Sequence, residues 1–521
     1  MYPSSHGAAR WLAKHSTTIE DKLFCAVMVI ALVHAIYILA FHIDGPIAGY
    51  RSFRPSQTAL TAYWLLRGGQ WLAYETPVLG APWSIPFEFP TFQLLTAALA
   101  GTGVPLNAAG RIVAFAFYVG TLWPLRSLFI SAGLGRPAFR VTAILFLTCP
   151  LYVYWGRAFM IETCALFFAV LWLSTWVRFL EETSIATGLL CIAAGCLAIL
   201  TKSTTFPAFT AVGCCAALAT LLHLRRSETG RAALAAKTFG LALIIVAVYA
   251  VGLAWVSYSD HVKAANAFGR MLTSEALADW NFGSLDQRLS AKLWIATIYA
   301  RSMKETLGWF FPVALCTLVA VFVSGRSRGA IGLCLLGYLL AFLVFTNLHV
   351  VHNYYQAANA IFLLAAVGLA IGEVYTSVSR AFATIVVLVI VIGQIGFFQQ
   401  FFAPKLNHDE STADQNWTIG QIAKSLTDPD QSLLIFGSEW SSQVSYSAER
   451  KALALPGWTP APMIERVLSD PQAFLGDRPL GGVVFCASKA YGDARPAIEA
   501  FANARKVLAE FKGCRFLSPL P

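Results

Sequence analysis

Long apolar segments recur along the chain and are separated by short polar turns. A bilayer is spanned by a helix of about 20 apolar residues, so this pattern predicts about eleven transmembrane helices. The expected spans lie near 23–41, 108–130, 139–155, 159–178, 185–201, 204–222, 237–258, 307–323, 329–348, 354–374 and 381–399. Two amphipathic stretches, 57–72 and 90–101, are too short or too polar to span and are expected to lie at the membrane interface.

The pattern changes after about residue 403, where charged and turn residues return. Apolar runs of strand length occur at 432–437 and 482–486, and helix-like stretches occur at 461–474 and 494–511. This alternation predicts a small soluble α/β domain with a partly parallel sheet. No catalytic constellation is recognisable there, so we expect an acceptor-binding or structural role.

The expected fold class is therefore an all-α polytopic membrane protein with a small C-terminal α/β domain. The expected parts are a cytoplasmic N-terminal segment 1–22, a transmembrane domain 23–402 that includes a large first loop 42–93, and a soluble domain 403–521. No small-residue cleavage site clearly follows the first apolar run, so this run is interpreted as an uncleaved anchor.

Composition agrees with this class, because 57% of the residues are hydrophobic and only 13% are charged. A net charge of +10 would favour nucleic-acid binding in a soluble protein. Here the basic residues gather in short loops between the spans, so nucleic acid is disfavoured as a partner. With a cytoplasmic N-terminus, every cytoplasmic loop carries basic residues, as the positive-inside rule requires. The first loop, the loop 259–306 and the C-terminal domain then lie outside.

Polar residues gather on this expected outer face. The first loop carries Asp44, Arg51, Arg54, Gln57, Glu75 and Glu88. The outer ends of later spans carry Arg157, Glu162, Lys202, His349, His352, Asn353, Tyr354 and Tyr355. An ionisable side chain near the hydrocarbon costs roughly 2.5–3.5 kcal/mol, so such groups usually line a wet cavity and pair there. One shared external cavity would accommodate them all.

The order of these segments resembles the GT-C superfamily of integral membrane glycosyltransferases. Within this superfamily the chain resembles the protein O-mannosyltransferases, the lipid A aminoarabinose transferases and the lipopolysaccharide galacturonosyltransferases. The resemblance covers roughly residues 20–400 and rests on Asp44, Arg-Ser-Phe-Arg-Pro-Ser-Gln-Thr-Ala (51–59), Phe-Glu-Phe-Pro (87–90), Gly-Arg-Ala-Phe-Met-Ile-Glu (156–162), Leu-Thr-Lys (200–202) and His-Asn-Tyr-Tyr (352–355).

The resemblance implies transfer of one sugar from a polyprenyl-phosphate donor to an acceptor in the cell envelope. The acceptor could be lipid A or lipopolysaccharide, another glycan, or a protein. The implied location is a bacterial inner membrane, where membrane lipids surround the spans, with the C-terminal domain in the periplasm. Neither the sugar nor the oligomeric state follows from the residues.

Displacement at an anomeric carbon needs a carboxylate to take the acceptor proton, and cations or a metal to stabilise the departing phosphate. The resemblance makes Asp44 the expected catalytic base. Arg54, Arg157 and Lys202 are candidate phosphate ligands. The other expected substrate-binding residues are Arg51, Gln57, Glu88, Glu162, His352 and Tyr354.

The chain departs from the family pattern at two positions. Glu88-Phe89-Pro90 stands where the aminoarabinose transferases have Lys-Pro-Pro, which removes one expected phosphate ligand. Asp44 stands alone where many relatives carry two adjacent acids. No metal ligand is therefore assigned, and a divalent metal, Mg or Mn, is left as an alternative to catalysis by the cations alone.

Each candidate residue also has a structural interpretation. Asp44 could be a turn residue before Gly45-Pro46, Arg51 and Arg54 could hold lipid headgroups, and Lys202 could extend to the membrane surface. Arg157 could form a structural ion pair with Glu162. His352, Tyr354 and Tyr355 could belong to an aromatic belt. Cys486 and Cys514 could form a disulfide, which the sequence leaves open.

Two other functions remain open, and a third is disfavoured. An O-antigen ligase or polymerase would use a diphosphate-linked donor, and a non-catalytic lipid-binding protein would keep the basic groups but tolerate loss of Asp44. A secondary transporter should show two related halves with interrupted helices, and neither a repeat nor paired Gly/Pro breaks is found.

Overall fold

The structure is a computed structural model that describes residues 18–49, 51–226, 230–409, 414–487 and 490–520. Most of the expected segment 1–22 lies outside these residues. The chain divides into two compact units, and each is described by itself. The first, called the helical unit, comprises the chain up to Phe41, Ala114–Trp255 and Ala278–Pro404. The second, called the loop–sheet unit, comprises His42–Val113, Val256–Leu277 and the chain from Lys405 onward.

The helical unit contains the apolar helices. They are α2 (Ile19–Ala40), α6 (Leu122–Ser131), α7 (Arg136–Thr148), α8 (Pro150–Trp155), α9 (Glu162–Glu182), α10 (Ile185–Thr201), α11 (Phe206–Arg226), α13 (Ala278–Phe282), α14 (Leu285–Leu289), the π-helix η2 (Lys292–Met303), α15 (Lys304–Leu307), α16 (Phe311–Ser324), α17 (Arg328–Val344), α18 (Thr346–Val351), the 3₁₀ helix η3 (Asn353–Ala358), α19 (Ala360–Ser377) and α20 (Arg380–Phe401). Helices α5 (Leu106–Gly120) and α12 (Arg231–Ala264) begin in one unit and end in the other.

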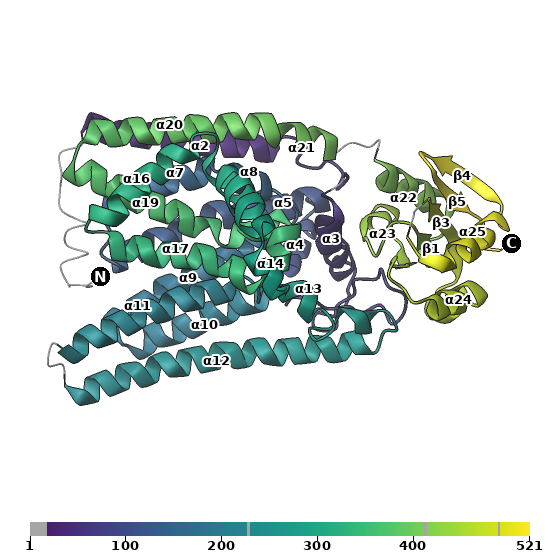
Figure 1. Cartoon of the computed structure of the whole chain (residues 1–521). Coiled ribbons are helices and arrows are strands. Elements are labelled where there is room, and N and C mark those ends of the chain that lie inside the picture. The colour runs from purple at the N-terminus through teal and green to yellow at the C-terminus, as the bar shows by residue number, and fades with distance from the viewer. Residues whose placement is uncertain (1–17, 50, 227–229, 410–413, 488–489, 521) are drawn as a thin grey trace. The chain divides into compact units, whose positions relative to one another are not determined.

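Helix α19 forms the centre of this unit, where it packs against α7, α16, α17 and α20 (Figure 1). It approaches α7 closely, because a Cβ on Gly372 would lie 2.7 Å from the Cα of Ala138. Small residues at such crossings are typical of membrane helices, whose association depends on close packing and not on hydrophobic burial. On another side of the unit, α9 packs against α10 and α11. This contact places the N-terminal end of α9 near the C-terminal end of α10.

The expected membrane class is confirmed. In the described part of the chain, seven helices are long and apolar enough to cross a membrane, or eight if the bent pair Lys292–Leu307 and Phe311–Ser324 forms one span. All eleven expected segments are helical, and the remaining three are short or broken. The segment 139–155 is divided into α7 and α8 at Cys149, and α10 and α17 have 17 residues each. The chain is a multi-pass membrane protein.

The loop–sheet unit combines the first loop with the C-terminal domain. Its helices are α3 (Phe53–Leu66), α4 (Thr91–Ala100), the 3₁₀ helix η1 (Gly269–Leu272), α22 (Gln415–Leu426), α23 (Gln443–Ala448), α24 (Ala461–Ser469), the 3₁₀ helices η4 (Pro471–Phe474) and η5 (Gly492–Ala494), and α25 (Arg495–Asn503); α21 (Ala403–Asp409) leads into it. Its strands are β1 (Ser432–Phe436), β2 (Lys451–Ala454), β3 (Leu480–Cys486), β4 (Val507–Phe511) and β5 (Cys514–Leu517).

The five strands form one sheet in the order β2-β1-β3-β5-β4. Strand β1 is parallel to β2 and β3, whereas β5 is antiparallel to β3 and β4. The expected partly parallel sheet and the strands at 432–437 and 482–486 are confirmed. The expected helix 494–511 is wrong in its last part, because α25 ends at Asn503 and residues 507–511 form β4. Pairing with β5 overrides the local helical pattern there.

The first loop adds an extended segment to the outer edge of β2. The amides of Ala452 and Ala454 donate to the carbonyls of Pro77 and Val78, at 3.0 and 2.8 Å, and the Gly80 amide donates to the Ala452 carbonyl at 3.0 Å. An ion pair between Lys451 and Glu75 lies beside these bonds. The first loop thus covers a sheet edge that would otherwise present unpaired backbone groups.

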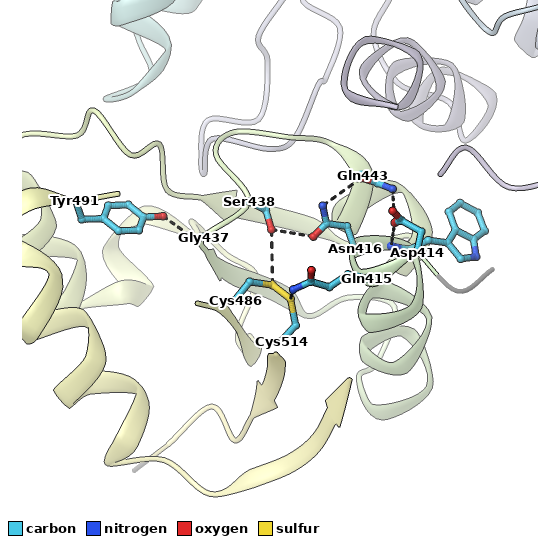
Figure 2. The surroundings of a disulfide bond; sticks show 10 residues. Asp414, Gln415, Asn416, Gly437, Ser438, Gln443, Cys486, Tyr491 and Cys514 are labelled. Atoms are coloured by element: carbon cyan, nitrogen blue, oxygen red, sulfur yellow. Dashed lines mark hydrogen bonds between the residues drawn. A yellow bond between two sulfur atoms is a disulfide. The ribbon is translucent and has the colours of Figure 1, made fainter. Parts of the chain in front are cut away.

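A disulfide joins the antiparallel strands of the sheet. Cys486 and Cys514 are directly opposite each other in the pairing of β3 with β5, and their sulfurs are bonded (Figure 2). The pairing that the sequence left open is therefore present in the structure. It connects the carboxyl end of β3 to the start of β5.

Candidate functional site

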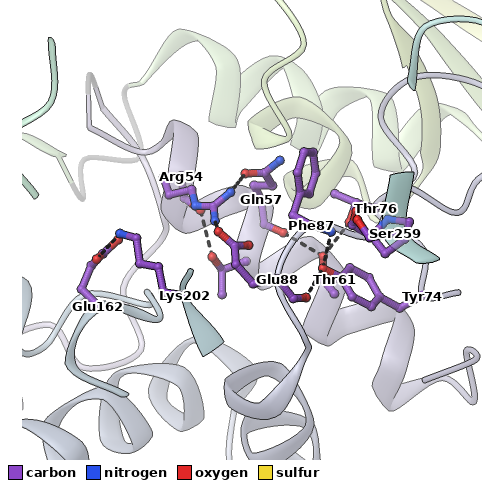
Figure 3. Close-up of polar contacts among 12 residues, drawn as sticks. Arg54, Gln57, Thr61, Tyr74, Thr76, Phe87, Glu88, Glu162, Lys202 and Ser259 are labelled. Carbon is purple, nitrogen blue, oxygen red and sulfur yellow. Dashed lines mark hydrogen bonds and ion pairs between the residues drawn. The ribbon is translucent and has the colours of Figure 1, made fainter. Parts of the chain in front are cut away.

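Arg54, Gln57 and Glu88 form a polar cluster in the loop–sheet unit. Arg54 lies in the first turn of α3 and donates hydrogen bonds to the side-chain oxygens of Gln57, one turn later, and of Glu88, which precedes α4 (Figure 3). The side chains of Arg54 and Glu88 are 17% and 21% exposed, so the ion pair is accessible without being fully solvated. The planar guanidinium can hold two partners at once, which a lysine could not do in this geometry.

The backbone that carries Glu88 is itself held in place. The Phe87 amide donates to the Tyr74 hydroxyl at 2.6 Å, and this hydroxyl donates to the Glu88 carbonyl at 2.7 Å. Ser259, near the end of α12, donates to the Pro86 carbonyl at 2.9 Å (Figure 3). Burial raises the pKa of Tyr74 well above its ordinary value, so the phenol stays protonated and can donate. Tyr74 is therefore a positioning residue for the cluster.

Asp44 is in the turn that follows the first helix and is exposed. Arg111, which is buried, fixes this turn by donating to the carbonyls of His42 and Ile43, at 2.5 and 2.9 Å. Asn107 donates to the Gly45 carbonyl at 3.2 Å. Within the described residues, the Asp44 carboxylate itself makes no hydrogen bond or ion pair. The backbone of the turn is thus ordered while the carboxylate is accessible.

The turn is also connected to the C-terminal domain. The Tyr446 hydroxyl of α23 donates to the side-chain oxygen of Asn107 at 2.6 Å. Burial raises the pKa of Tyr446 well above its ordinary value, and the nearby negative charge of Asp44 contributes to this shift. Arg51, the remaining candidate of the first loop, is half-buried just before α3.

Glu162 and Lys202 form the centre of a second cluster, which belongs to the helical unit. Lys202 follows the last residue of α10 and donates to Glu162, the first residue of α9 (Figure 3). Both side chains are buried, with exposures of 3% for Lys202 and 1% for Glu162. The other carboxylate oxygen of Glu162 has no hydrogen-bond partner among the described residues. Lys202 is thus paired inside the protein and does not extend to a membrane surface.

Aromatic rings surround the Lys202 ammonium. Its Nζ lies 4.1 Å from the ring centre of Tyr355 and 5.6 Å from that of Tyr354, within the range of cation–π attraction. The Tyr354 ring also stacks on His352 at 5.1 Å and meets the edge of Trp155 at 5.7 Å. His352 and Tyr354 therefore belong to the same cluster as Lys202.

Arg157 is buried in the helical unit and donates to the Phe41 carbonyl at 2.7 Å. The alternative of an ion pair between Arg157 and Glu162 is not what the structure shows, because Glu162 pairs with Lys202. Arg157 instead fixes the end of the first helix, directly before the turn that carries Asp44.

The candidate residues thus fall into two groups. One group in the loop–sheet unit contains Arg54, Gln57 and Glu88, with Asp44 and Arg51 elsewhere in the same unit. The other group in the helical unit contains Glu162, Lys202, His352 and Tyr354. Reasoning from the sequence missed Tyr74, Ser259 and Arg111, whose isolated positions gave no signal, and did not select Tyr355 although it is part of the His-Asn-Tyr-Tyr motif.

The described residues contain no preformed cluster of metal ligands. No three His, Cys, Asp or Glu side chains come together there as metal ligands would. Glu88 and Glu162 form ion pairs with Arg54 and Lys202, two of the candidate phosphate ligands.

Solved structures share this architecture. ArnT from Cupriavidus metallidurans bound to undecaprenyl phosphate matches with a TM-score of 0.63 and 13% sequence identity, over 94% of this chain and 98% of that chain. Arabinofuranosyltransferase AftD from mycobacteria matches with a TM-score of 0.55 and 14% identity, over 98% of this chain and 40% of that chain. Both are GT-C glycosyltransferases. This chain has the GT-C fold.

Sequence comparison alone does not detect this relationship. No protein-family model matches the chain, and no curated protein sequence matches it significantly. The apo state of the same ArnT matches with a TM-score of 0.61, so the similarity does not depend on the bound lipid of that protein. The fold resemblance that the sequence motifs suggested is confirmed at the level of the GT-C fold.

Proposed function

We propose that this GT-C protein is a glycosyltransferase that transfers a single sugar from a polyprenyl-phosphate donor to an acceptor in the cell envelope. The observation that carries the proposal is the Arg54–Gln57–Glu88 cluster, a half-buried cation held in a fixed orientation in the first loop of a GT-C fold. The similar ArnT structure contains undecaprenyl phosphate, which makes a lipid monophosphate the first donor to test.

The reaction requires one bond to form and one to break. The acceptor oxygen forms a bond to the anomeric carbon, and the bond from that carbon to the phosphate oxygen breaks, with its electron pair left on the phosphate. Asp44 takes the acceptor proton, which suits a carboxylate that is accessible and has no protein partner in the described residues. The held backbone of the turn keeps this base oriented.

Cations stabilise the negative charge that develops on the departing phosphate. Arg54 is the candidate in the loop–sheet unit, and Arg157 and Lys202 are the candidates in the helical unit. Glu88 and Glu162 orient Arg54 and Lys202, and the partnerless oxygen of Glu162 can accept a hydroxyl hydrogen bond. If a metal such as Mg or Mn takes part, it would add a further positive charge at the phosphate.

The proposed location is a bacterial inner membrane with the N-terminus in the cytoplasm and the C-terminal domain in the periplasm. The positive-inside distribution of basic residues supports this orientation. The disulfide in the C-terminal domain also supports it, because such bonds persist in oxidising compartments. The acceptor, whether lipid A, lipopolysaccharide, glycan or protein, would then be an envelope component.

The proposal is tested by transfer of radiolabelled sugar from a panel of polyprenyl-monophosphate donors into membranes. Membranes contain the intact protein, Asp44→Asn, or the control Glu275→Gln, which changes an exposed acid of the same unit. The expected result is incorporation by the intact protein and by the control, and its loss in Asp44→Asn. Incorporation unaffected by Asp44→Asn would overturn the assigned base.

A second arm uses diphosphate-linked oligosaccharide donors. Transfer from these and from no monophosphate donor would replace the proposal with a ligase or polymerase. Binding of lipid phosphate without transfer from any donor would favour the non-catalytic lipid-binding protein. Monodisperse purification of each variant checks that loss of transfer does not come from misfolding.

A further inference from the structure

The loop that follows β1 brings an aromatic ring of the C-terminal domain to the first loop. This loop, Gly437 to Trp440, is at the carboxyl end of a central parallel strand. The Trp440 ring meets the edge of the Phe53 ring at 5.1 Å and lies over the Phe87 ring at 5.9 Å, with 31° between the latter planes. All three side chains are partly exposed.

The loop is held rigidly and in an unusual backbone conformation. Gly437 and Glu439 both have positive φ, at 87° and 51°, which is uncommon for a residue with a side chain such as Glu439. The Gly437 amide donates to the Tyr491 hydroxyl at 2.8 Å, and the Gly457 amide donates to the Glu439 carboxylate at 3.0 Å. Backbone strain of this kind persists where the surroundings determine it and clusters at functional sites.

The disulfide region supports the same loop from behind. The Ser438 hydroxyl donates to the side-chain oxygen of Asn416 at 3.2 Å and lies 3.9 Å from the sulfur of Cys486 (Figure 2). At Gly437, a Cβ would lie 2.0 Å from the Cys486 carbonyl oxygen, so only glycine permits this approach. Trp440 is therefore presented by a fixed scaffold and not by a free loop.

The aromatic wall borders the candidate phosphate ligand. The guanidinium carbon of Arg54 lies 5.9 Å from the centre of the Phe87 ring. Phe53 and Gln57 are four positions apart on α3 and share one face of it. Gln57 is 3% exposed, and its Nε2 is buried with no hydrogen-bond partner among the described residues. A buried donor of this kind requires an acceptor, which a bound ligand would supply.

We infer that Trp440, Phe53 and Phe87 form the wall of a subsite for the sugar ring of the donor, with Gln57 donating a hydrogen bond to one of its oxygens. The inference rests on the proposed function, since Arg54 binds the phosphate to which that sugar is bonded. The C–H groups on one face of a sugar are weakly positive and pack against the negative face of an aromatic ring. The hydroxyls at the sugar's edge then need polar partners.

This assignment gives the C-terminal domain a part in choosing the sugar. The first loop would recognise the lipid phosphate through Arg54, and Trp440 of the C-terminal domain would recognise the sugar that the phosphate carries. A domain with a purely structural role would not need a partly exposed tryptophan on a strained loop, beside a buried amide nitrogen that has no hydrogen-bond partner among the described residues.

The test compares two ligands with the purified full-length protein. One is undecaprenyl phosphate, and the other is undecaprenyl phosphate carrying one monosaccharide, chosen as the tightest binder in a panel of pentose, hexose and uronic-acid forms. Trp440→Ala is expected to weaken binding of the sugar-bearing lipid by about tenfold and to leave undecaprenyl phosphate within about twofold. Trp440→Phe should recover part of the loss, and Trp71→Ala, an exposed tryptophan of the same unit, should change neither.

Equal weakening of both lipids by Trp440→Ala would overturn the inference, because the ring would then act on the phosphate or on domain packing. Unchanged binding of both lipids would overturn it as well. If the intact protein binds neither lipid, the proposed function itself fails, which separates the two failures. Thermal unfolding identifies a variant that does not fold, and in that case the comparison uses Trp440→Phe. A selective loss in Trp440→Phe then supports the inference, and equal or absent loss overturns it.

Discussion

Arg54 and Glu88 are joined by an ion pair although 34 positions separate them in the chain. The pair closes the first loop at the point where α3 begins and α4 is about to begin. Arg54 simultaneously holds Gln57, so one guanidinium organises both α3 and the segment that leads into α4. Its two partners fix the plane of the guanidinium.

Replacement of Arg54 should reduce sugar transfer in a graded way. Arg54→Lys keeps the charge but cannot hold Gln57 and Glu88 with one planar group, so we expect about a tenfold loss. Arg54→Gln removes the charge and should cost about a hundredfold. Initial rates at varied donor concentration measure both variants. Arg495→Gln, which removes the exposed Arg495–Glu499 ion pair, is the control, and equal losses in control and test would argue against a specific role.

Removing one member of the buried Lys202–Glu162 pair should destabilise the protein more than removing both. Lys202→Met leaves the Glu162 carboxylate buried and uncompensated, and is expected to lower the free energy of unfolding by about 3–5 kcal/mol. Adding Glu162→Gln should restore most of this loss. Arg178→Gln, in an exposed pair, should cost under about 1 kcal/mol. Thermal unfolding in detergent compares the intact protein, Lys202→Met, the double variant and Arg178→Gln. A double variant that is as unstable as Lys202→Met alone would contradict the prediction.

Two glycines of the first loop offer a matched test of its attachment to the sheet. Gly80 and Gly68 both have positive φ, but a Cβ on Gly80 would lie 2.6 Å from the Phe474 carbonyl oxygen, whereas Gly68 faces open space. Gly68→Ala should cost about 1–2 kcal/mol from backbone strain alone. Gly80→Ala should cost more, because it also disturbs the pairing with β2. Equal shifts in melting temperature would mean that this contact is adaptable.

Protonation of Glu449 is expected to lower the stability of the protein at acidic pH. Burial raises the pKa of this carboxyl, but hydrogen bonds from Lys424 and Tyr63 and the charges of Lys424 and Arg67 outweigh it and hold the pKa below the usual 4.5. A group with a lowered folded pKa stabilises the fold above its unfolded pKa, and this contribution is lost as the pH falls through the folded pKa. The melting temperatures of the intact protein and Glu449→Gln should therefore differ at neutral pH and converge below pH 4.5. A difference that stays constant with pH would exclude this carboxylate as the cause.

The disulfide should stabilise the C-terminal domain, and its presence in cells would report the compartment in which this domain lies. Cys486 and Cys514 are 28 positions apart, and closing such a loop stabilises a fold by about 3–4 kcal/mol in the chain-entropy account. Cys486→Ser should lower the melting temperature of the purified protein, and a reductant should lower that of the intact protein but not of the variant. In cells, alkylation before reduction should leave both thiols unlabelled if the domain is periplasmic. Labelling of both thiols under these conditions would count against the proposed orientation.

The sequence predicted the elements whose signal is local. Strands β1 and β3 are continuous apolar runs bounded by glycine or polar residues, and both were expected. Strand β2 is only four residues long and β4 continues a helical pattern, so their strand character comes from pairing partners that are distant in the chain. The spans were recognisable because membrane insertion imposes a length and an apolar composition on each helix.

The sequence identified the residues of the candidate site but not which of them form hydrogen bonds and ion pairs with one another. Arg54 and Glu88 were both selected, yet nothing in their spacing indicates that they pair. Lys202 was expected to be a phosphate ligand and Glu162 a substrate-binding residue, and the contact of α9 with α10 decides that these two side chains meet. Tyr74 was missed because its role depends on the path of the backbone at Phe87 and Glu88, which no side-chain pattern records.

The pairing of the first loop with β2 sets an order for assembly. Lys451 and Glu75 are 376 positions apart, so the first loop is made long before the strand edge that it joins. During synthesis the later spans are inserted before this segment can pair. Its hydrogen bonds to β2 can form only after the chain has been made through Ala454. Premature termination before β2 would therefore damage the first loop, although every residue of that loop had been made.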